Sequence, residues 1–229
     1  QSILKQSGMV PTGDGVVLAG QGPLLLVTLA QILDRGGSVA AVLDLGQSGG
    51  PIGSASGLIP AVMSDPAIMA QGASLLWRAK RSGVAWYRRV TGLRATGDNG
   101  IEQVAFETGG KSVRLPCSLL AVHDGVIPNT LLTRLLALDH VWNTAQQAFA
   151  ARCTPEGSTS APSVWVAGDG AGIAGVEVAR LRGTLSGLDV ARVLGALDEP
   201  GFQTRAEPLK QRIARRAPAR AFVDRLYAP

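Results

Sequence analysis

The stretch Asp14-Gly-Val-Val-Leu-Ala-Gly-Gln-Gly-Pro-Leu-Leu25 decides the fold of this chain. A short apolar run, residues 14–20, predicts a buried strand. Proline at position 23 predicts the start of an apolar helix over 23–35, because the first helical position needs no N–H. A second apolar run over 38–44 follows the pair Gly36-Gly37. Strand, helix and strand form a βαβ unit, so we expect the two strands to be parallel.

The turn between this strand and helix has the pattern of a nucleotide-binding loop. Gly20 and Gly22 would let a phosphate approach the backbone at the N-terminus of the helix that Pro23 opens, although Leu25 replaces the usual third glycine. Asp44 ends the second strand, where an acid holds a ribose hydroxyl and disfavours a 2′-phosphate. We therefore expect NAD or ATP here. The alternatives are a tight turn without a ligand and a vestigial, empty site.

The middle of the chain predicts helices followed by an antiparallel meander. Residues 46–57 form a glycine- and serine-rich loop, and residues 58–81 are helical with a break at Asp65-Pro66. The meander extends from residue 83 to residue 122, with a hairpin at Asn99-Gly100. The fold class is therefore α/β, with a Rossmann-like parallel sheet and an antiparallel β-meander.

The second chemical motif is Val164-Trp-Val-Ala-Gly-Asp-Gly-Ala-Gly-Ile-Ala-Gly175. An apolar strand over 163–167 would end in Gly168-Asp169-Gly170, and a helix would follow over about 172–197. A carboxylate in that turn can accept hydrogen bonds from backbone N–H groups or from the sugar hydroxyls of a ligand. Asp169 is thus either an ordinary helix cap or part of a cofactor site.

Residues 159–169, Thr-Ser-Ala-Pro-Ser-Val-Trp-Val-Ala-Gly-Asp, resemble the C-terminal flavin signature of two-dinucleotide-domain flavoproteins, the pyridine nucleotide-disulfide oxidoreductase family. Together with residues 20–25 and 123–130, this motif is similar to the α-type subunits of opine oxidases, hydrogen cyanide synthase and dye-linked amino-acid dehydrogenases. The resemblance implies that Asp169 binds ribityl or neighbouring hydroxyls of FAD. It also implies a group of FAD-contacting residues: Pro128, Asn129, Gly168, Asp169, Gly170, Gly172 and Ile173.

The resemblance also implies the division of the chain. We expect an NAD-like nucleotide-binding domain over 12–117, the C-terminal part of an FAD-binding domain over 118–197, and a basic helical tail over 198–229. In the family, a further βαβ unit precedes these parts and supplies the rest of the FAD site, and no such motif precedes Asp14. We therefore expect FAD to be shared with that N-terminal segment or with another subunit, and this chain alone to be inactive.

The implied activity is dehydrogenation of an amine, amino acid or opine, with electrons passed to a partner subunit. Cys117 and Cys153 are 36 residues apart, which excludes a redox dithiol and fits two reduced, buried thiols in the cytoplasm. Tyr87 is followed four residues later by Thr91 rather than by the lysine of a short-chain dehydrogenase. His123 and His140 have no metal-ligand spacing, so we expect no metal and structural roles for both. We assign no catalytic residue.

The net charge of +5 comes from the tail, where seven basic residues after Phe202 face two acidic ones. Apolar residues at helical spacing there predict helices that pack, broken at Pro218, with a solvated basic face. Docking of the tail on a partner subunit is the second interpretation, and binding of nucleic acid is the third. The richest apolar run, residues 24–33, is too short to span a bilayer, which needs about 20 apolar residues.

Overall fold

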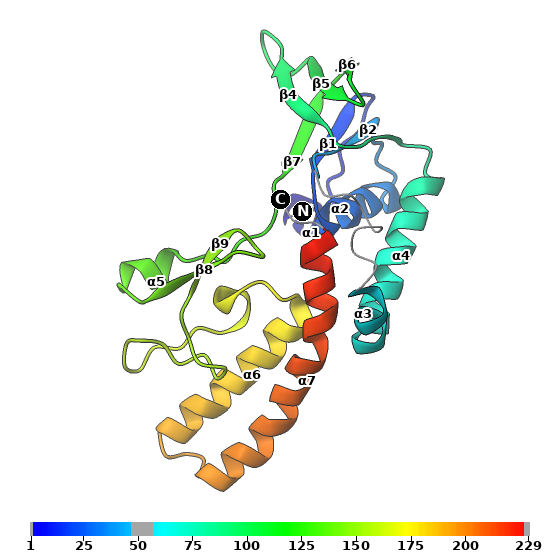
Figure 1. Cartoon of the computed structure of the whole chain (residues 1–229). Coiled ribbons are helices and arrows are strands. Elements are labelled where there is room, and N and C mark those ends of the chain that lie inside the picture. Colours follow the sequence, from blue (N-terminus) through cyan, green and yellow to red (C-terminus); the bar gives the residue numbers. More distant parts are fainter. Residues whose placement is uncertain (1, 47–56, 227–229) are drawn as a thin grey trace. The chain divides into compact units, whose positions relative to one another are not determined.

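The computed structural model describes residues 2–46 and 57–226, which divide into two compact units (Figure 1). The described part of unit 1 comprises residues 2–46 and 67–125, and that of unit 2 comprises residues 57–66 and 126–226. The loop predicted over 46–57 lies almost entirely outside the described residues.

Unit 1 is built on a parallel sheet that contains the predicted βαβ unit. Its strand order is β3-β2-β1-β7, with β1 at Val16–Gly20, β2 at Ala41–Asp44, β3 at Ala85–Tyr87 and β7 at Leu119–His123. Helix α2, Pro23–Asp34, connects β1 to β2, and Pro23 occupies its first turn as expected. Strands β1 and β2 pair in parallel, so the predicted Rossmann-like half is confirmed.

The two faces of this sheet are covered by different elements. Leu18 and Val42 pack with residues of α2, of α1 (Ser2–Gln6) and of α4 (Pro66–Arg81). Val17 and Leu43 point the other way, toward the antiparallel sheet of β4 (Thr91–Thr96), β5 (Gln103–Thr108) and β6 (Lys111–Pro116). The alternation of adjacent strand residues therefore fills two separate cores.

The antiparallel meander is smaller than the sequence predicts. Strands β4, β5 and β6 form it, with the predicted hairpin between β4 and β5, but β3 and β7 pair in parallel with β2 and β1. Consequently β7, which the sequence assigned to the domain starting at residue 118, lies in the parallel sheet, and unit 1 extends to Gly125. Period-two alternation identifies a strand but not its partner.

Unit 2 is a helical layer with a hairpin. Its elements are α3 (Leu58–Ser64), α5 (Leu131–Leu135), the hairpin β8 (His140–Asn143) and β9 (Ala148–Ala151), a 3-10 turn over Gly168–Ala171, α6 (Val176–Val193) and α7 (Glu199–Leu226). Helices α6 and α7 run side by side, and α3 packs on α7 (Figure 1). Phe202 and Ala206 are buried beside Leu185 of α6.

Two predictions for unit 2 are wrong. Residues 163–167 do not form a strand, because in the described structure only Trp165 pairs with a neighbouring segment, through one bridge to Ser158. The tail is a single helix that continues through Pro208 and Pro218. A proline inside a helix costs about 3 kcal/mol or more, and burial of Ala219 and Phe222 in the turn after Pro218 offsets that cost.

Candidate functional site

The carboxyl ends of three parallel strands bring Asp44, Gly20 and His123 to the same level of the sheet. Gly20 is in register with Asp44 on one side and with His123 on the other. Chain order reverses between β1 and β7, since β2 and β3 follow on the opposite side of β1. Open α/β sheets bind their ligands in the crevice at such a reversal point. The predicted residues Gly20 and Asp44 therefore border the expected place.

A side chain at position 20 is sterically impossible. A Cβ placed on Gly20 would overlap the carbonyl oxygen of His123, and the Gln21 N–H donates to that same oxygen over 3.2 Å. Gly20 also has a φ of +151°, which L-residues rarely adopt. The glycine thus permits the close approach of the β1–α2 loop to the end of β7.

The N-terminus of α2 leaves backbone donors at this loop. Gly22 is the N-cap residue, with a φ of +91°, and Pro23 follows at the first helical position, as predicted. Gly22 and Pro23 are half-buried and exposed, respectively. The positive end of a helix dipole attracts phosphates. Leu25, at the place of the third glycine, is buried in the core and instead stabilises the packing of α2.

Asp44 is held by its own loop. Its Oδ1 accepts a hydrogen bond from the Gly46 N–H over 3.0 Å, and the side chain is half-buried. A carboxylate has acceptor capacity for several donors, so the bond to Gly46 orients the group and leaves room for ribose hydroxyls. This geometry is compatible with the predicted role of Asp44.

His123, the last residue of β7, lies beside the Gly20 loop, although the sequence predicts a structural role for it. A methyl group built on Gly22 would lie 4.0 Å from its Nε2 atom. Burial lowers the pKa of the imidazole, and Asp124 raises it to a smaller extent, so that the ring is neutral near pH 7. In sequence, His123 stands at the end of an apolar run. That position becomes informative only when the run is known to pair beside β1.

Asp169 lies in the 3-10 turn rather than in α6 itself. Its Oδ1 accepts a hydrogen bond from the Ala174 N–H over 3.3 Å, and its carbonyl oxygen accepts one from the Gly172 N–H over 3.1 Å. Gln146 at the tip of the β8–β9 hairpin bonds both the N–H and the carbonyl of Ile173. The predicted residues Gly168, Asp169, Gly170, Gly172 and Ile173 thus form one continuous turn before α6.

This turn has open space beside the backbone at its C-terminal end. A Cβ on Gly172 or Gly175 would meet no atom within 4 Å. The Asp169 side chain is half-buried, and its carboxylate caps the turn that leads into α6. A glycine-lined, partly accessible backbone with an ionisable oxygen beside a helix start can receive polar groups of a ligand.

The segment before Asp169 is fixed to α6 by a buried polar network. Trp165 Nε1 donates to Asp189 Oδ2 over 2.8 Å, and Arg192 Nη2 donates to Asp189 Oδ1 over 2.6 Å. Only 4% of the Asp189 side chain is exposed. The network holds residues 164–167 in an extended path without a partner strand, and so it places the Gly168–Ala171 turn.

A cavity of about 270 Å³ adjoins this turn. Its lining comes from two stretches and from α6, namely Cys153, Thr154, Pro155, Gly157, Val166, Ala171, Arg182 and Ser186. Arg182 Nη1 donates to the carbonyl oxygen of Gly172 over 2.7 Å. Burial raises the pKa of the Cys153 thiol, more than the nearby Arg182 guanidinium lowers it. The thiol is therefore protonated near pH 7 and is a poor nucleophile.

Pro128 and Asn129 serve the start of α5 in this structure. Pro128 is buried, and Asn129 Oδ1 accepts a hydrogen bond from the Leu131 N–H over 3.1 Å. The described contacts do not connect either residue to Asp169. Gly20, Gly22, Pro23 and Asp44 belong to unit 1. The structure therefore gathers them in one group and residues 168–173 of unit 2 in another, with Pro128 and Asn129 in neither.

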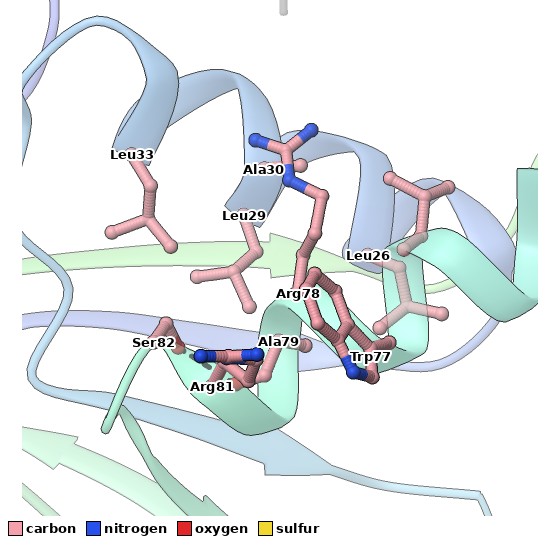
Figure 2. A pocket seen from close by; sticks show the side chains of 10 residues that line it. Leu26, Leu29, Ala30, Leu33, Trp77, Arg78, Ala79, Arg81 and Ser82 are labelled. Atoms are coloured by element: carbon pink, nitrogen blue, oxygen red, sulfur yellow. Dashed lines mark hydrogen bonds between the residues drawn. The ribbon is translucent and has the colours of Figure 1, made fainter.

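A second cavity of about 230 Å³ lies between α2 and α4 (Figure 2). Leu26, Leu29 and Leu33 of α2 face Trp77 and Arg78 of α4 across it, and it contains none of the predicted site residues. The described residues contain no cluster of three or more possible metal ligands. Within the same residues, none of the helices has the length and apolar character needed to cross a membrane.

Comparison with known proteins gives relatives along the whole chain. The chain is 35% identical over 232 residues to an opine oxidase subunit of Rhizobium meliloti, and the match covers all of this chain and 43% of that protein. It is 28% identical to the hydrogen cyanide synthase subunit HcnB of Pseudomonas protegens, covering 97% of this chain and 48% of that protein. The chain thus spans about half the length of the curated relatives it matches. No family model matches it.

A solved structure has the same fold. The bacillithiol disulfide reductase of Staphylococcus aureus superposes with a TM-score of 0.54 at 14% identity, over 79% of this chain and 51% of that one. The expected resemblance to two-dinucleotide-domain oxidoreductases is confirmed, as is the similarity to subunits of opine oxidase and hydrogen cyanide synthase. The α/β fold class is confirmed as well.

Proposed function

We propose that this chain is part of an FAD-dependent oxidoreductase that dehydrogenates an amine, amino acid or opine and passes the electrons to a partner subunit. The observation that carries the proposal is the 35% identity to the opine oxidase subunit of Rhizobium meliloti over the whole chain. The names of both relatives describe subunits, which supports a partner protein.

The Gly168–Ile173 turn fits one side of an FAD site. Asp169 can accept hydrogen bonds from sugar hydroxyls while it keeps its bond to the Ala174 N–H. Gly172 leaves open space where a Cβ would stand, so that a ligand can approach the backbone. Bound FAD would supply the acceptor for a hydride from the substrate carbon next to nitrogen. This chain's residues would bind and orient it.

Removing the Asp169 carboxylate tests this assignment. In the assembled enzyme, Asp169→Ala should release most of the flavin, measured as the FAD absorbance per mole of purified protein. Asp139→Ala is the matched control, since Asp139 is exposed in the same unit and should leave the flavin content unchanged. Wild-type flavin content in Asp169→Ala would contradict the assignment.

The separate chain provides a second test of the same proposal. Because the resemblance implies that another segment or subunit supplies the other wall of the FAD site, this chain purified alone should carry little or no flavin. A stoichiometric yellow cofactor in that material would show that the FAD site is complete within these residues and would overturn the shared-site proposal.

A second candidate function is binding of an adenine nucleotide, ATP or NAD, as a structural or regulatory ligand at the Gly20 loop. The alignment of Gly20 with Asp44 at the carboxyl end of the parallel sheet favours it. Calorimetric titration of the chain with ATP, ADP and NAD should give binding heat that Asp44→Ala abolishes. Equal heats for wild type and variant would exclude Asp44 from the site.

A further inference from the structure

We propose that His123 is the side chain that contacts a phosphate group of the adenine nucleotide at the Gly20 loop. This inference rests on the nucleotide site of the second candidate function and adds a residue to it. The site is thereby bordered by three consecutive neighbours in the sheet, Asp44 on β2, Gly20 on β1 and His123 on β7.

The position of His123 in the sheet directs its side chain toward the loop. In β7, Ala121 packs against the core that α2 covers, and side chains two residues apart point to the same face of a strand. His123 therefore lies on the α2 side of the sheet, at its carboxyl edge. The 4.0 Å separation between its Nε2 and a methyl group built on Gly22 agrees with this placement.

A backbone contact holds the end of β7 against the loop. The His123 carbonyl accepts a hydrogen bond from the Gln21 N–H, and the absence of a side chain on Gly20 lets the two strands approach there. The loop and the end of β7 therefore form a single rigid edge. A ligand bound on the loop at Gly22 would meet the ring of His123 next to the backbone.

The chemistry of the ring suits an anion. A neutral imidazole carries one N–H and can donate a hydrogen bond to a phosphate oxygen. Asp44 is an acceptor and suits ribose hydroxyls, whereas His123 is a donor and suits phosphate. The two side chains on opposite sides of Gly20 therefore recognise different parts of one nucleotide, and of these two side chains only His123 should distinguish a nucleotide from a nucleoside.

The test compares ADP with adenosine in calorimetric titrations of the full 229-residue chain. A hydrogen bond to a charged group contributes about 1.5–3 kcal/mol, so His123→Ala should weaken ADP binding about 10- to 150-fold. The same variant should leave adenosine binding within about 2-fold of wild type, because the lost donor faces the phosphate. His123→Gln keeps an N–H donor and should restore part of the ADP affinity. Asp44→Ala should weaken the binding of both ADP and adenosine.

The outcomes separate the two proposals. If ADP binds, Asp44→Ala weakens it and His123→Ala does not, the nucleotide site stands and the role of His123 is refuted. If His123→Ala weakens adenosine binding as much as ADP binding, His123 shapes the loop and contacts no phosphate. That result also refutes the proposed role of His123. If wild type binds neither ligand, the nucleotide site itself fails. Equal thermal unfolding of His123→Gln and wild type ensures that the comparison is made between folded proteins.

Discussion

The Asp189→Ala substitution should be among the most destabilising single changes in unit 2. The Asp189 carboxylate is almost fully buried and accepts hydrogen bonds from the indole of Trp165 and the guanidinium of Arg192. A hydrogen bond to a charged acceptor contributes about 1.5–3 kcal/mol. The pair with the guanidinium of Arg192 adds little to this, because solvent screens the partly exposed partner. We expect Asp189→Ala to lower the free energy of unfolding by about 2–4 kcal/mol.

Urea unfolding followed by circular dichroism measures this loss, and a double-mutant cycle with Trp165→Phe isolates its main component. The coupling energy between Asp189 and Trp165 should exceed about 1 kcal/mol, because the indole donates directly to the buried Asp189 carboxylate. Asp139→Ala, at an exposed position of the same unit, should change stability by less than about 0.5 kcal/mol. A loss below about 0.5 kcal/mol for Asp189→Ala, with no coupling to Trp165, would refute the role of this network in holding residues 164–167.

Two further predictions concern the loop that borders the cavity near Asp169. Burial raises the pKa of Glu156, but its hydrogen bond and ion pair with Lys210 outweigh this and hold the pKa below its usual 4.5. Glu156 therefore stabilises the fold above that pH, and the stability difference between wild type and Glu156→Gln should shrink as pH falls from 4.5 through the lowered pKa of Glu156. A difference that persists in acid would contradict the ion pair. Gly157→Ala should cost about 2 kcal/mol or more, since Gly157 has a φ of +91° and a Cβ there would lie 2.5 Å from Ser186 Oγ. By contrast, Gly187→Ala on α6, which meets no atom within 4 Å, should stabilise by about 0.5–1 kcal/mol. Equal stability of the two glycine variants by urea unfolding would refute this reasoning.

The first βαβ unit could be predicted from sequence because its signals are local. Pro23, the apolar periodicity of α2 and the two apolar runs act within a few residues of one another. The partners of β3 and β7 could not be predicted, because β7 pairs with β1 across about a hundred residues of chain. The helix break predicted at Pro218 is wrong for a different reason. Packing of α7 on α3 and α6 outweighs the tendency of proline to end a helix.

The same distinction between local and long-range signals explains which site residues the sequence could indicate. Gly20, Asp44 and Asp169 stand next to glycines or strand ends, where residue type alone restricts what the backbone and side chain can do. Cys153 and Arg182 come from different segments and meet only through folding, so neither has a sequence signal.

His123 lies between these two cases. The apolar run that it ends is visible in the sequence, but its place in the site depends on the pairing of β7 with β1. In sequence it ends an apolar run, and a lone histidine there has no assignable role. Once β7 is placed beside β1, the same residue lies at the point where chain order reverses, level with Gly20 and Asp44. The strand order thus places an isolated imidazole beside Gly20 and Asp44 at the carboxyl edge of the sheet. Replacing a single side chain at the end of β7 should therefore change affinity for a phosphate-bearing ligand while the sheet that positions it remains intact.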